Sequence, residues 1–273
     1  MVNKKTKILS VINQKGGNSK TTTVINLAAA LSIFGKKVLI IDFDPQGNAS
    51  STLFGTKAIK AHEGIYNLLT GEIKGLDLNY KDFIKTYKGR NDDQEFEIDV
   101  LPTDTTLFKA EFELMSLTGR EFFLRNQVIS KIEADNEYDY VIIDSQPSLG
   151  VLVINVLCCS SENELIIAMR PDSFSREGID TILNAIGSLK RSLGVMPKGY
   201  NILINQWVKT QISDRYNVNQ IEKDLPDKCF KTEIRRDTKF GQAHDAKCDI
   251  FTYDNKTDGA VDYLRFAKEL LGE

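Results

Sequence analysis

Residues 13–22 read Asn-Gln-Lys-Gly-Gly-Asn-Ser-Lys-Thr-Thr and stand between a strand pattern and a helical pattern. The preceding residues 7–12 are mostly apolar or β-branched, as in a buried parallel strand. The following residues 23–34 have helical character, and Gly35 comes next as a usual helix C-cap. A glycine-rich turn that enters a helix points backbone N–H groups and the positive end of the helix dipole at one spot. The run therefore predicts a loop that binds phosphate.

The loop carries two lysines with different surroundings. Lys20 stands where it can reach the β- and γ-phosphates of a nucleotide, and the hydroxyl of Thr21 can ligate Mg²⁺. Lys15 precedes the two glycines, and Ser19 takes the place before Lys20 where a glycine is expected. The predicted nucleotide contacts in this loop are Lys15, Gly16, Gly17, Asn18, Ser19, Lys20, Thr21 and Thr22.

Ser19 is the unusual residue of the loop. The backbone before the lysine lies tight against phosphate, and we expect a conformation there that is costly for a residue with a side chain. Two interpretations follow. Either the serine is tolerated and its hydroxyl adds a hydrogen bond, or it distorts the cradle and leaves a protein that is slow or only binds nucleotide. Retention of the other motif residues favours the first interpretation.

Short apolar runs alternate with helical patterns along the chain. This alternation predicts a mostly parallel sheet covered by helices on both faces. Because no linker, repeat or low-complexity tract divides residues 1–273, we expect a single doubly wound α/β domain. Residues 87–97 are polar and predict a loop or an insertion. The predicted strands are residues 7–12, 37–42, 96–101, 138–144, 164–169 and 200–205, and the predicted helices are residues 23–34, 105–116, 120–136, 150–159, 176–193 and 260–271.

Polar residues follow several of these strands. Asp42 and Asp44 come at the end of the second strand, Asp144 ends the fourth, and Asn205 ends the last. Ligands of such sheets bind at the carboxyl ends of the strands, so these residues should converge with the phosphate loop, Asn205 as a further nucleotide contact. A carboxylate near a γ-phosphate can orient or deprotonate the attacking water. A buried carboxylate such as Asp144 needs a cation, and we expect it to hold Mg²⁺.

These motifs resemble those of the ParA/MinD family of deviant Walker A ATPases. Residues 15–22 are similar to the family loop Lys-Gly-Gly-x-Gly-Lys-Thr-Thr. Residues 42–48 match every fixed position of the segment Asp-x-Asp-Pro-Gln-Gly-Asn. Residues 144–150 are similar to the switch Asp-x-Pro-Pro-Ser-Leu-Gly, with Gln146 in place of the first proline.

The resemblance continues to the end of the chain. Residues 234–260 are similar to the closing block Ile-Pro-Arg-Asn…Glu-Ala…Tyr-Asp…Gly-Ala, with Arg235 at the proline position and Gln242 at the glutamate position. The similarity covers about residues 6–271. The phosphate loop begins too near the first residue for a helix-turn-helix domain ahead of it, so the resemblance is to the short, Soj-like branch of the family.

The resemblance implies a P-loop ATPase with ATP and Mg²⁺ as cofactors. It implies that Lys15 reaches across a nucleotide-sandwiched homodimer to the partner's phosphates, that Asp44 is the hydrolytic residue, and that Asp42 supports the Mg²⁺ shell beside Thr21 and Asp144. The ATP-bound dimer would bind DNA without sequence preference, and a ParB-type partner would stimulate hydrolysis. We therefore expect a cytoplasmic, nucleoid-associated protein that partitions plasmid or chromosomal DNA.

The charge is unevenly distributed along the chain. The net charge is −3, but residues 186–241 hold eleven Lys/Arg against six Asp/Glu, so this segment is +5 and the remainder −8. Such asymmetry is typical of a face that meets phosphate backbones, and it also occurs on ordinary solvated surfaces. The residues predicted to contact DNA are Lys209, Arg235 and Lys239.

Three other functions are possible for a chain with a phosphate loop of this kind. A MinD-like regulator would need a basic amphipathic helix on anionic lipid, whereas the apolar face of residues 260–271 favours core packing, so we expect no membrane contact. An iron–sulfur relative would need suitably spaced cysteines. The first cysteine is Cys158, and the four cysteines of the chain predict buried thiols instead. A cargo-positioning ATPase of the same family would have the same chemistry, and the sequence does not separate it from a partition ATPase.

Overall fold

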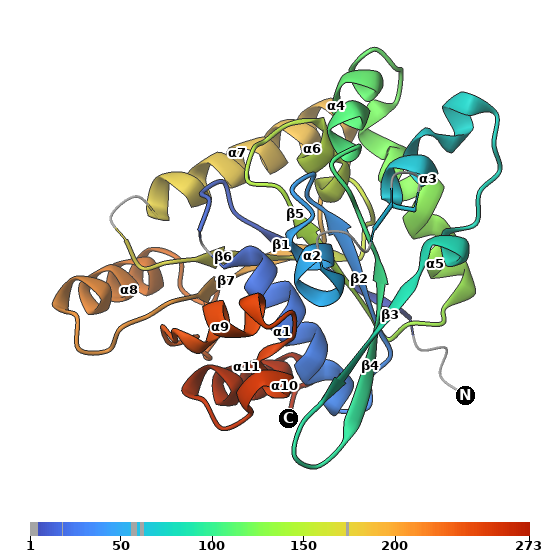
Figure 1. Cartoon of the computed structure of the whole chain (residues 1–273). Coiled ribbons are helices and arrows are strands. Elements are labelled where there is room, and N and C mark those ends of the chain that lie inside the picture. The colour runs from blue at the N-terminus through green and yellow to red at the C-terminus, as the bar shows by residue number, and fades with distance from the viewer. Residues whose placement is uncertain (1–4, 18, 56–58, 61–62, 173–174) are drawn as a thin grey trace.

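The computed structural model describes residues 5–17, 19–55, 59–60, 63–172 and 175–273. Its centre is a seven-stranded sheet in the order β3-β4-β2-β5-β1-β6-β7 (Figure 1). Neighbouring strands run parallel, except that β3 and β4 form an antiparallel pair. The strands are β1 (Lys7–Ile12), β2 (Val38–Phe43), β3 (Lys85–Arg90), β4 (Glu95–Leu101), β5 (Tyr140–Ser145), β6 (Asn163–Met169) and β7 (Gly199–Ile204).

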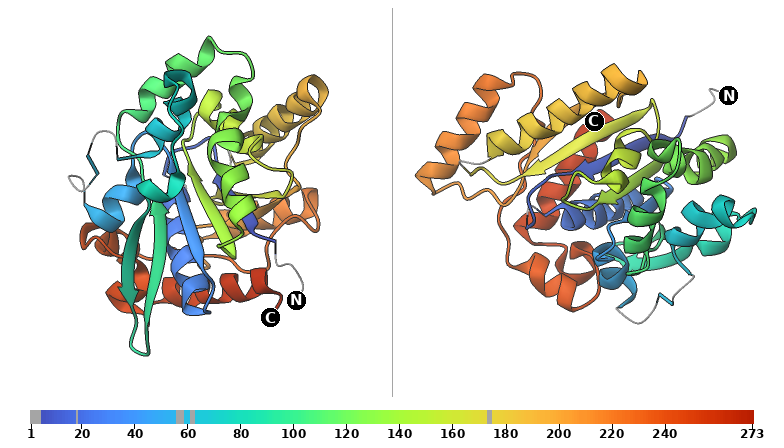
Figure 2. Two further views of the ribbon diagram at one scale, coloured as in Figure 1. Left: turned by 90° about the vertical axis from the view of Figure 1, so that its right-hand side faces the viewer. Right: turned by 90° about the horizontal axis from the view of Figure 1, so that it is seen from above.

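Helices cover both faces of the sheet, as the view from above in Figure 2 shows. The α-helices are α1 (Lys20–Ile33), α2 (Asn48–Phe54), α3 (Ile65–Gly71), α4 (Leu107–Met115), α5 (Ser130–Asp135), α6 (Val151–Leu157), α7 (Ser175–Leu193), α8 (Ile212–Asp224), α9 (Lys239–Asp245), α10 (Ile250–Asp254) and α11 (Asp258–Leu271). Shorter turns are the 3₁₀ segments η1 (Glu72–Lys74), η2 (Tyr80–Phe83) and η3 (Arg120–Phe122) and the π segment η4 (Arg125–Ile129).

Side chains of the central strands alternate between two hydrophobic cores. In β2, Leu39 and Ile41 belong to the core under α3 to α8, whereas Val38 and Ile40 belong to the core under α1, α2, α10 and α11. Successive side chains of a strand point to opposite faces, so a strand covered on both faces needs a continuous apolar run. The predicted doubly wound, mostly parallel α/β fold is confirmed.

Two predictions about local structure are wrong. Residues 87–97, predicted as a loop or an insertion, contain the end of β3 and the start of β4, so that only residues 91–94 between them form a loop. The predicted helix 120–136 is broken into η3, η4 and α5. The buried side chain of Asn155 causes this break by accepting from the backbone N–H of Leu124 at 3.0 Å and donating to the carbonyl of Arg120 at 2.7 Å.

The last helix packs in the core, as the apolar face of residues 260–271 predicts. Ala267 is fully buried, and the largest buried side chains of α11 are Tyr263 and Phe266. The partly buried residues that pack at the margin of this core are Leu264, Leu270 and Leu271.

The cysteines follow the prediction in part. Cys158 and Cys159 are buried, Cys229 and Cys248 are half-buried, and all four are free thiols. Within the described ranges, no helix has both the length and the apolar character that crossing a membrane requires.

Candidate functional site

The phosphate loop joins the end of β1 to the start of α1. Here the chain turns through the left-handed conformation of Gly17, at a φ of 78°. A cavity of about 400 Å³ opens in front of the loop. The predicted contacts that line it are Gly16, Gly17, Ser19, Lys20, Thr21 and Thr22. Asn18, also predicted as a contact, lies outside the described residues.

Ser19 has the costly backbone conformation that its position predicts. Its φ of 60° and ψ of 30° lie in the left-handed region, where a residue with a Cβ is strained and glycine is not. Ser19 also precedes α1 as its N-cap, yet its side chain makes no capping hydrogen bond. The hydroxyl is therefore not used in the way that usually favours serine at this position.

Lys20 is buried at the base of the cavity, where only 7% of the residue is exposed. Burial lowers the pKa of its ammonium group, and the nearby carboxylates of Asp144 and Asp44 oppose this shift. A buried cation that faces an open cavity is suited to bind an anion there. The binding of nucleotide phosphates by this lysine stays a prediction.

Asp42 and Asp144 lie opposite each other on neighbouring strands, as Cα partners of β2 and β5. Both are fully buried. Burial is the largest cause that raises the pKa of Asp144 well above its ordinary value, with the charge of Asp42 adding to it. Burial also raises the pKa of Asp42 to about 7, although hydrogen bonds from Ser50 oppose the shift. Two buried carboxylates side by side favour the binding of a cation at the end of the cavity that is next to them.

The side chains here fit Mg²⁺ when a phosphate completes its shell. The Thr21 hydroxyl donates to Asp144 Oδ2 at 2.7 Å, and Asp144 Oδ1 is buried without a hydrogen-bond partner in the described part of the chain. An orphaned buried carboxylate oxygen beside a hydroxyl is a suitable pair of ligands for a hard cation. The described residues contain no group of three or more His, Cys, Asp or Glu able to hold a metal alone. Mg²⁺ commonly binds through one or two protein groups together with substrate phosphates.

Asp44 lies on the cavity wall and Asp42 behind it. Asp42 Oδ2 accepts hydrogen bonds from the backbone N–H and the hydroxyl of Ser50, at 2.8 and 2.6 Å, so it fastens the start of α2 to β2. Asp44 accepts from the N–H of Gln46 at 2.9 Å. Burial raises the pKa of Asp44, and the charge of Lys20 opposes the rise. Of the two, only Asp44 lines the cavity.

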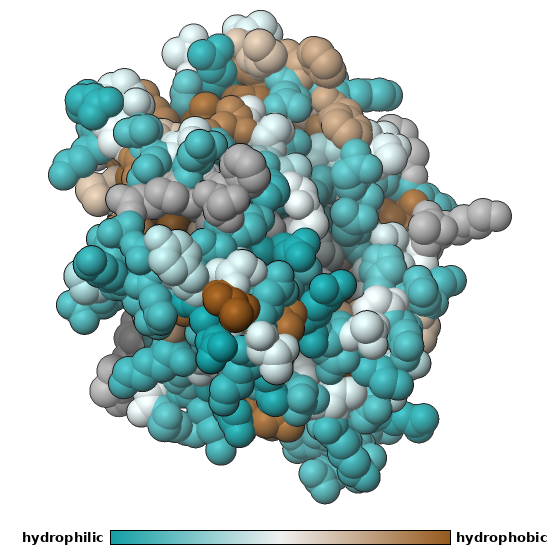
Figure 3. Space-filling model, turned by 90° about the vertical axis from the view of Figure 1, so that its left-hand side faces the viewer, coloured by the Kyte–Doolittle hydropathy of each residue, from teal (hydrophilic) through white to brown (hydrophobic). Residues whose placement is uncertain are grey.

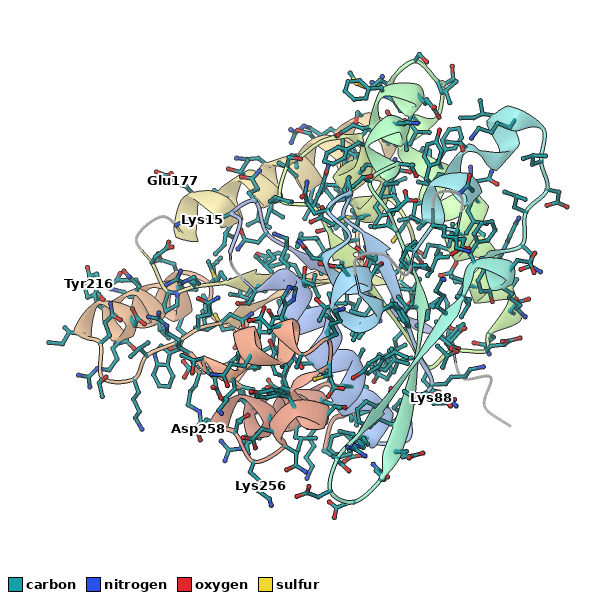
Figure 4. The ribbon with its side chains drawn as sticks, viewed as in Figure 1. Lys15, Lys88, Glu177, Tyr216, Lys256 and Asp258 are labelled. Carbon is teal, nitrogen blue, oxygen red and sulfur yellow. The ribbon has the colours of Figure 1, made fainter. Side chains whose placement is uncertain are left out.

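Lys15 points away from the loop to which it belongs. Figure 4 shows its side chain directed away from α1 and toward the start of α7. Its ammonium group lies 2.6 Å from Asp172 Oδ2, and 51% of the side chain is exposed. Lys15 is not among the residues that line the cavity. In this single chain it is therefore at the surface beside the phosphate site rather than in it.

Asn205 does not reach the cavity as predicted. It is fully buried, and its amide donates to the hydroxyl of Thr23 in α1 at 3.0 Å. The next residue, Gln206, lines the cavity instead. The sequence also gave no sign of the opposite wall, which includes Phe240 and His244 of α9. Their spacing of four residues places them on one face of a helix, but this spacing does not by itself indicate a binding site.

The three predicted DNA contacts have different surroundings. Lys209 is exposed, and the Lys239 ammonium lies 5.7 Å from the centre of the Tyr253 ring. The guanidinium of Arg235 is held by two carboxylates of α11. It lies 2.7 Å from Asp262 Oδ1 and 2.8 Å from Asp258 Oδ1. This arginine links the closing segment to the last helix, and its contact with DNA stays a prediction.

The doubly wound α/β fold, the phosphate loop and the aspartates beside it together define the class of protein as a P-loop ATPase. Residues 6–196 match the family model described as an AAA domain. The sporulation initiation inhibitor protein Soj of Bacillus subtilis is 34% identical over 269 residues, which cover 97% of this chain and 98% of that protein. The chromosome-partitioning ATPase Soj of Treponema pallidum is 31% identical over 266 residues, with 97% of each chain covered.

A solved structure agrees with these relatives. Cobyrinic acid a,c-diamide synthase from Mycobacterium smegmatis, crystallised with bound ADP and magnesium, superposes with a TM-score of 0.75 at 27% identity, over 97% of this chain and 94% of that one. The chain belongs to the ParA/MinD family of ATPases and is similar to its Soj members along its whole length. The family predicted from the motifs and the ATPase activity that it implies are confirmed.

Proposed function

We propose that this ATPase partitions DNA. In this proposal an ATP-bound homodimer binds plasmid or chromosomal DNA without sequence preference, in the cytoplasm on the nucleoid, and a ParB-type partner stimulates slow hydrolysis. Similarity over the full length to a chromosome-partitioning ATPase supports it. The structural observation that carries the proposed dimer is the position of Lys15. Its ammonium group lies at the protein surface, outside the phosphate cavity of its own chain. Residues 1–273 would act as one domain.

The site residues would divide the ATPase chemistry among themselves. Lys20 and the loop N–H groups would bind the phosphates of ATP, while Thr21 and Asp144 would hold Mg²⁺, with Asp42 behind them. The ion would neutralise negative charge on the β- and γ-phosphates. Asp44, at the cavity wall, would orient the attacking water and accept its proton as the bond from the γ-phosphorus to the ADP oxygen breaks. ADP and inorganic phosphate would be the products.

The Lys15→Ala variant is expected to bind ATP but to remain a monomer. Lys15 lies beside its own cavity rather than in it, so its loss leaves the phosphate contacts of one chain intact. In a nucleotide-sandwiched dimer, the same ammonium would reach the phosphates of the other chain. The measurement is light scattering after size-exclusion chromatography, with Mg²⁺ and a non-hydrolysable ATP analogue, beside a nucleotide-binding titration.

Lys5 provides the matched control for this experiment. It is also an exposed lysine in a surface ion pair, 3.0 Å from Glu162. Lys5 precedes β1, whereas the phosphate loop follows the other end of that strand. The Lys5→Ala variant should dimerise like the wild type. Dimerisation of the Lys15→Ala variant at wild-type affinity would exclude the proposed role for Lys15.

The proposed DNA surface lies on the side of the molecule that carries α8 and the start of α7. Figure 3 shows that the centre and lower part of this side are mostly hydrophilic, with few apolar side chains. Lys209 and Lys239 belong to the segment 186–241, whose charge is +5. Two chains in a dimer would double the charge that faces one DNA molecule, so affinity should follow dimerisation.

DNA binding is expected to require ATP, to show no sequence preference and to weaken steeply with salt. Reversing one charge in the Lys209→Glu or the Lys239→Glu variant should lower the affinity of the ATP-bound protein for DNA by about tenfold. It should also reduce the salt dependence, because one phosphate contact fewer releases about one counterion fewer. Fluorescence anisotropy with duplexes of unrelated sequence, at several salt concentrations, measures both effects.

Lys88 offers the control lysine outside this segment. It lies on β3, with 77% of its side chain exposed and an ion pair to Glu97 at 3.2 Å. The Lys88→Glu variant should bind DNA like the wild type. Tight binding by the nucleotide-free monomer would contradict the proposed ATP dependence. No binding by the ATP-bound dimer would contradict the proposed DNA surface and favour a cargo-positioning ATPase that does not use DNA.

A further inference from the structure

Two residues other than glycine adopt left-handed backbone conformations beside the same cavity. Ser19 has a φ of 60°, and Gln206, which follows β7, has a φ of 56°. Both residues line the cavity. A residue with a Cβ persists in this region only when its surroundings hold it there. The contacts of these two residues therefore indicate what stabilises the backbone conformation of the phosphate loop.

The two strained residues bond to each other. The side-chain amide of Gln206 donates a hydrogen bond to the hydroxyl of Ser19. It also donates to the backbone carbonyl of Gly17 at 3.1 Å. One carboxamide thus holds the loop at two points, on either side of Asn18. The Ser19 hydroxyl, which makes no capping bond to α1, is used here instead.

The backbone on both sides of Gln206 is fixed by other strands and segments. The N–H of Asn205 donates to the carbonyl of Met169 at the end of β6, at 2.7 Å. The N–H of Trp207 donates to the carbonyl of Ile234 at 3.1 Å. Gln206 is therefore held from both sides, and its side chain can act as a fixed support for the phosphate loop.

We propose that Gln206 is a positioning residue for nucleotide binding, because its carboxamide holds Ser19 in the left-handed conformation that a glycine would adopt unaided. The inference rests on the proposal that ATP phosphates bind in this loop. It resolves the two interpretations of Ser19. The serine is tolerated because Gln206 holds its hydroxyl, and the pair replaces the glycine that this position usually has.

A double-mutant cycle tests the pair. The variants are Ser19→Gly, Gln206→Met and the two combined, and the measurement is the affinity for a fluorescent ATP analogue with Mg²⁺. Methionine keeps the length of the side chain and the backbone strain but removes the amide donor. Gln211→Met is the matched control, since Gln211 is an exposed glutamine further along the same loop, at the N-cap of α8. Thermal unfolding of each variant verifies that it is folded.

The expected result is a loss that depends on Ser19. Gln206→Met should weaken analogue binding about three- to tenfold, the range that one neutral hydrogen bond supports. Ser19→Gly should bind as tightly as the wild type or up to about tenfold more tightly, since it removes the strain. In the Ser19→Gly background, adding Gln206→Met should change affinity by less than about twofold. Gln211→Met should have no effect.

Other outcomes overturn the inference in distinguishable ways. An equal loss from Gln206→Met in both backgrounds would mean that Gln206 acts independently of Ser19, through its bond to the Gly17 carbonyl or by touching the nucleotide directly. No loss in the wild-type background would remove Gln206 from any role in binding. A folded wild-type protein that binds no analogue would refute the proposed nucleotide site itself, and this inference with it.

Discussion

Replacing Lys20 with alanine is expected to lower the affinity for ATP by about 100- to 1,000-fold. The variant loses the buried cation that faces the phosphates, and it leaves Asp44 and Asp144 without the positive charge between them. Truncating one partner of a buried charge pair between protein and ligand costs about 2–5 kcal/mol of binding free energy, and each 1.4 kcal/mol corresponds to a tenfold change in affinity. A titration with a fluorescent ATP analogue and Mg²⁺ measures the loss.

Lys256 is a suitable control for this variant. It lies between α10 and α11, away from the cavity (Figure 4), with 82% of its side chain exposed and an ion pair to Asp92 at 3.1 Å. Lys256→Ala should bind ATP normally. A Lys20→Gln variant, which keeps most of the side-chain volume, separates loss of charge from loss of packing. ATP binding by the folded Lys20 variants at wild-type affinity would mean that the phosphates bind elsewhere.

The Asp44→Ala variant should bind ATP and dimerise while its hydrolysis rate falls by about 10²- to 10⁴-fold, the usual contribution of a general base. Asp44 is the carboxylate on the cavity wall. Asp42 accepts a hydrogen bond from the hydroxyl of Ser50, and Asp144 accepts one from the hydroxyl of Thr21. Loss of Asp44 removes the group that orients the attacking water but leaves the phosphate contacts in place. Release of inorganic phosphate, with and without a stimulating partner, measures the rate.

Two further variants sharpen this experiment. Asp44→Asn keeps the shape of the side chain and removes only its charge, so it should lose as much activity as the alanine variant. Asp77, whose side chain is fully exposed and lies 3.6 Å from Lys131, provides the control Asp77→Asn, which should keep full activity. Equal hydrolysis rates for Asp44→Asn and the wild type would exclude Asp44 as the hydrolytic residue.

The sequence predicted the parallel strands well because the sheet is covered on both faces. A strand with two buried faces needs an unbroken apolar run, and such a run is easy to recognise. β3 was missed because it lies at the edge of the sheet, where only Tyr87 and Gly89 are buried and the residues that alternate with them are exposed and polar. Tyr87 of β3 also contacts the N-cap of α10, which is distant in the sequence, and no local pattern predicts such a contact. The Tyr87 hydroxyl, for example, donates to Asp249 at 2.8 Å.

The candidate site was predictable wherever its residues follow strands of the sheet. Asp42 and Asp144 come together because β2 and β5 are neighbours and their carboxyl ends meet at one edge. The prediction failed at Asn205, where successive side chains point in opposite directions. Asn205 turns toward Thr23 in α1, and Gln206 faces the cavity. The wall formed by α9 was beyond prediction, since packing between distant segments places it there.

The two edges of the sheet limit how copies of this chain can join. At β7, the outer backbone groups of Ile202 bond to Lys228 and Phe230, at 2.7 and 2.9 Å, so a following segment already occupies that edge. At β3, the charged side chains of Lys88 and Arg90 flank the buried Gly89, and charges of this kind discourage pairing with another strand. Folded copies should therefore meet through side-chain surfaces, an association that nucleotide turnover can reverse. A continuous ladder of backbone hydrogen bonds between two copies, which nucleotide turnover could not undo, is disfavoured at both edges of the sheet.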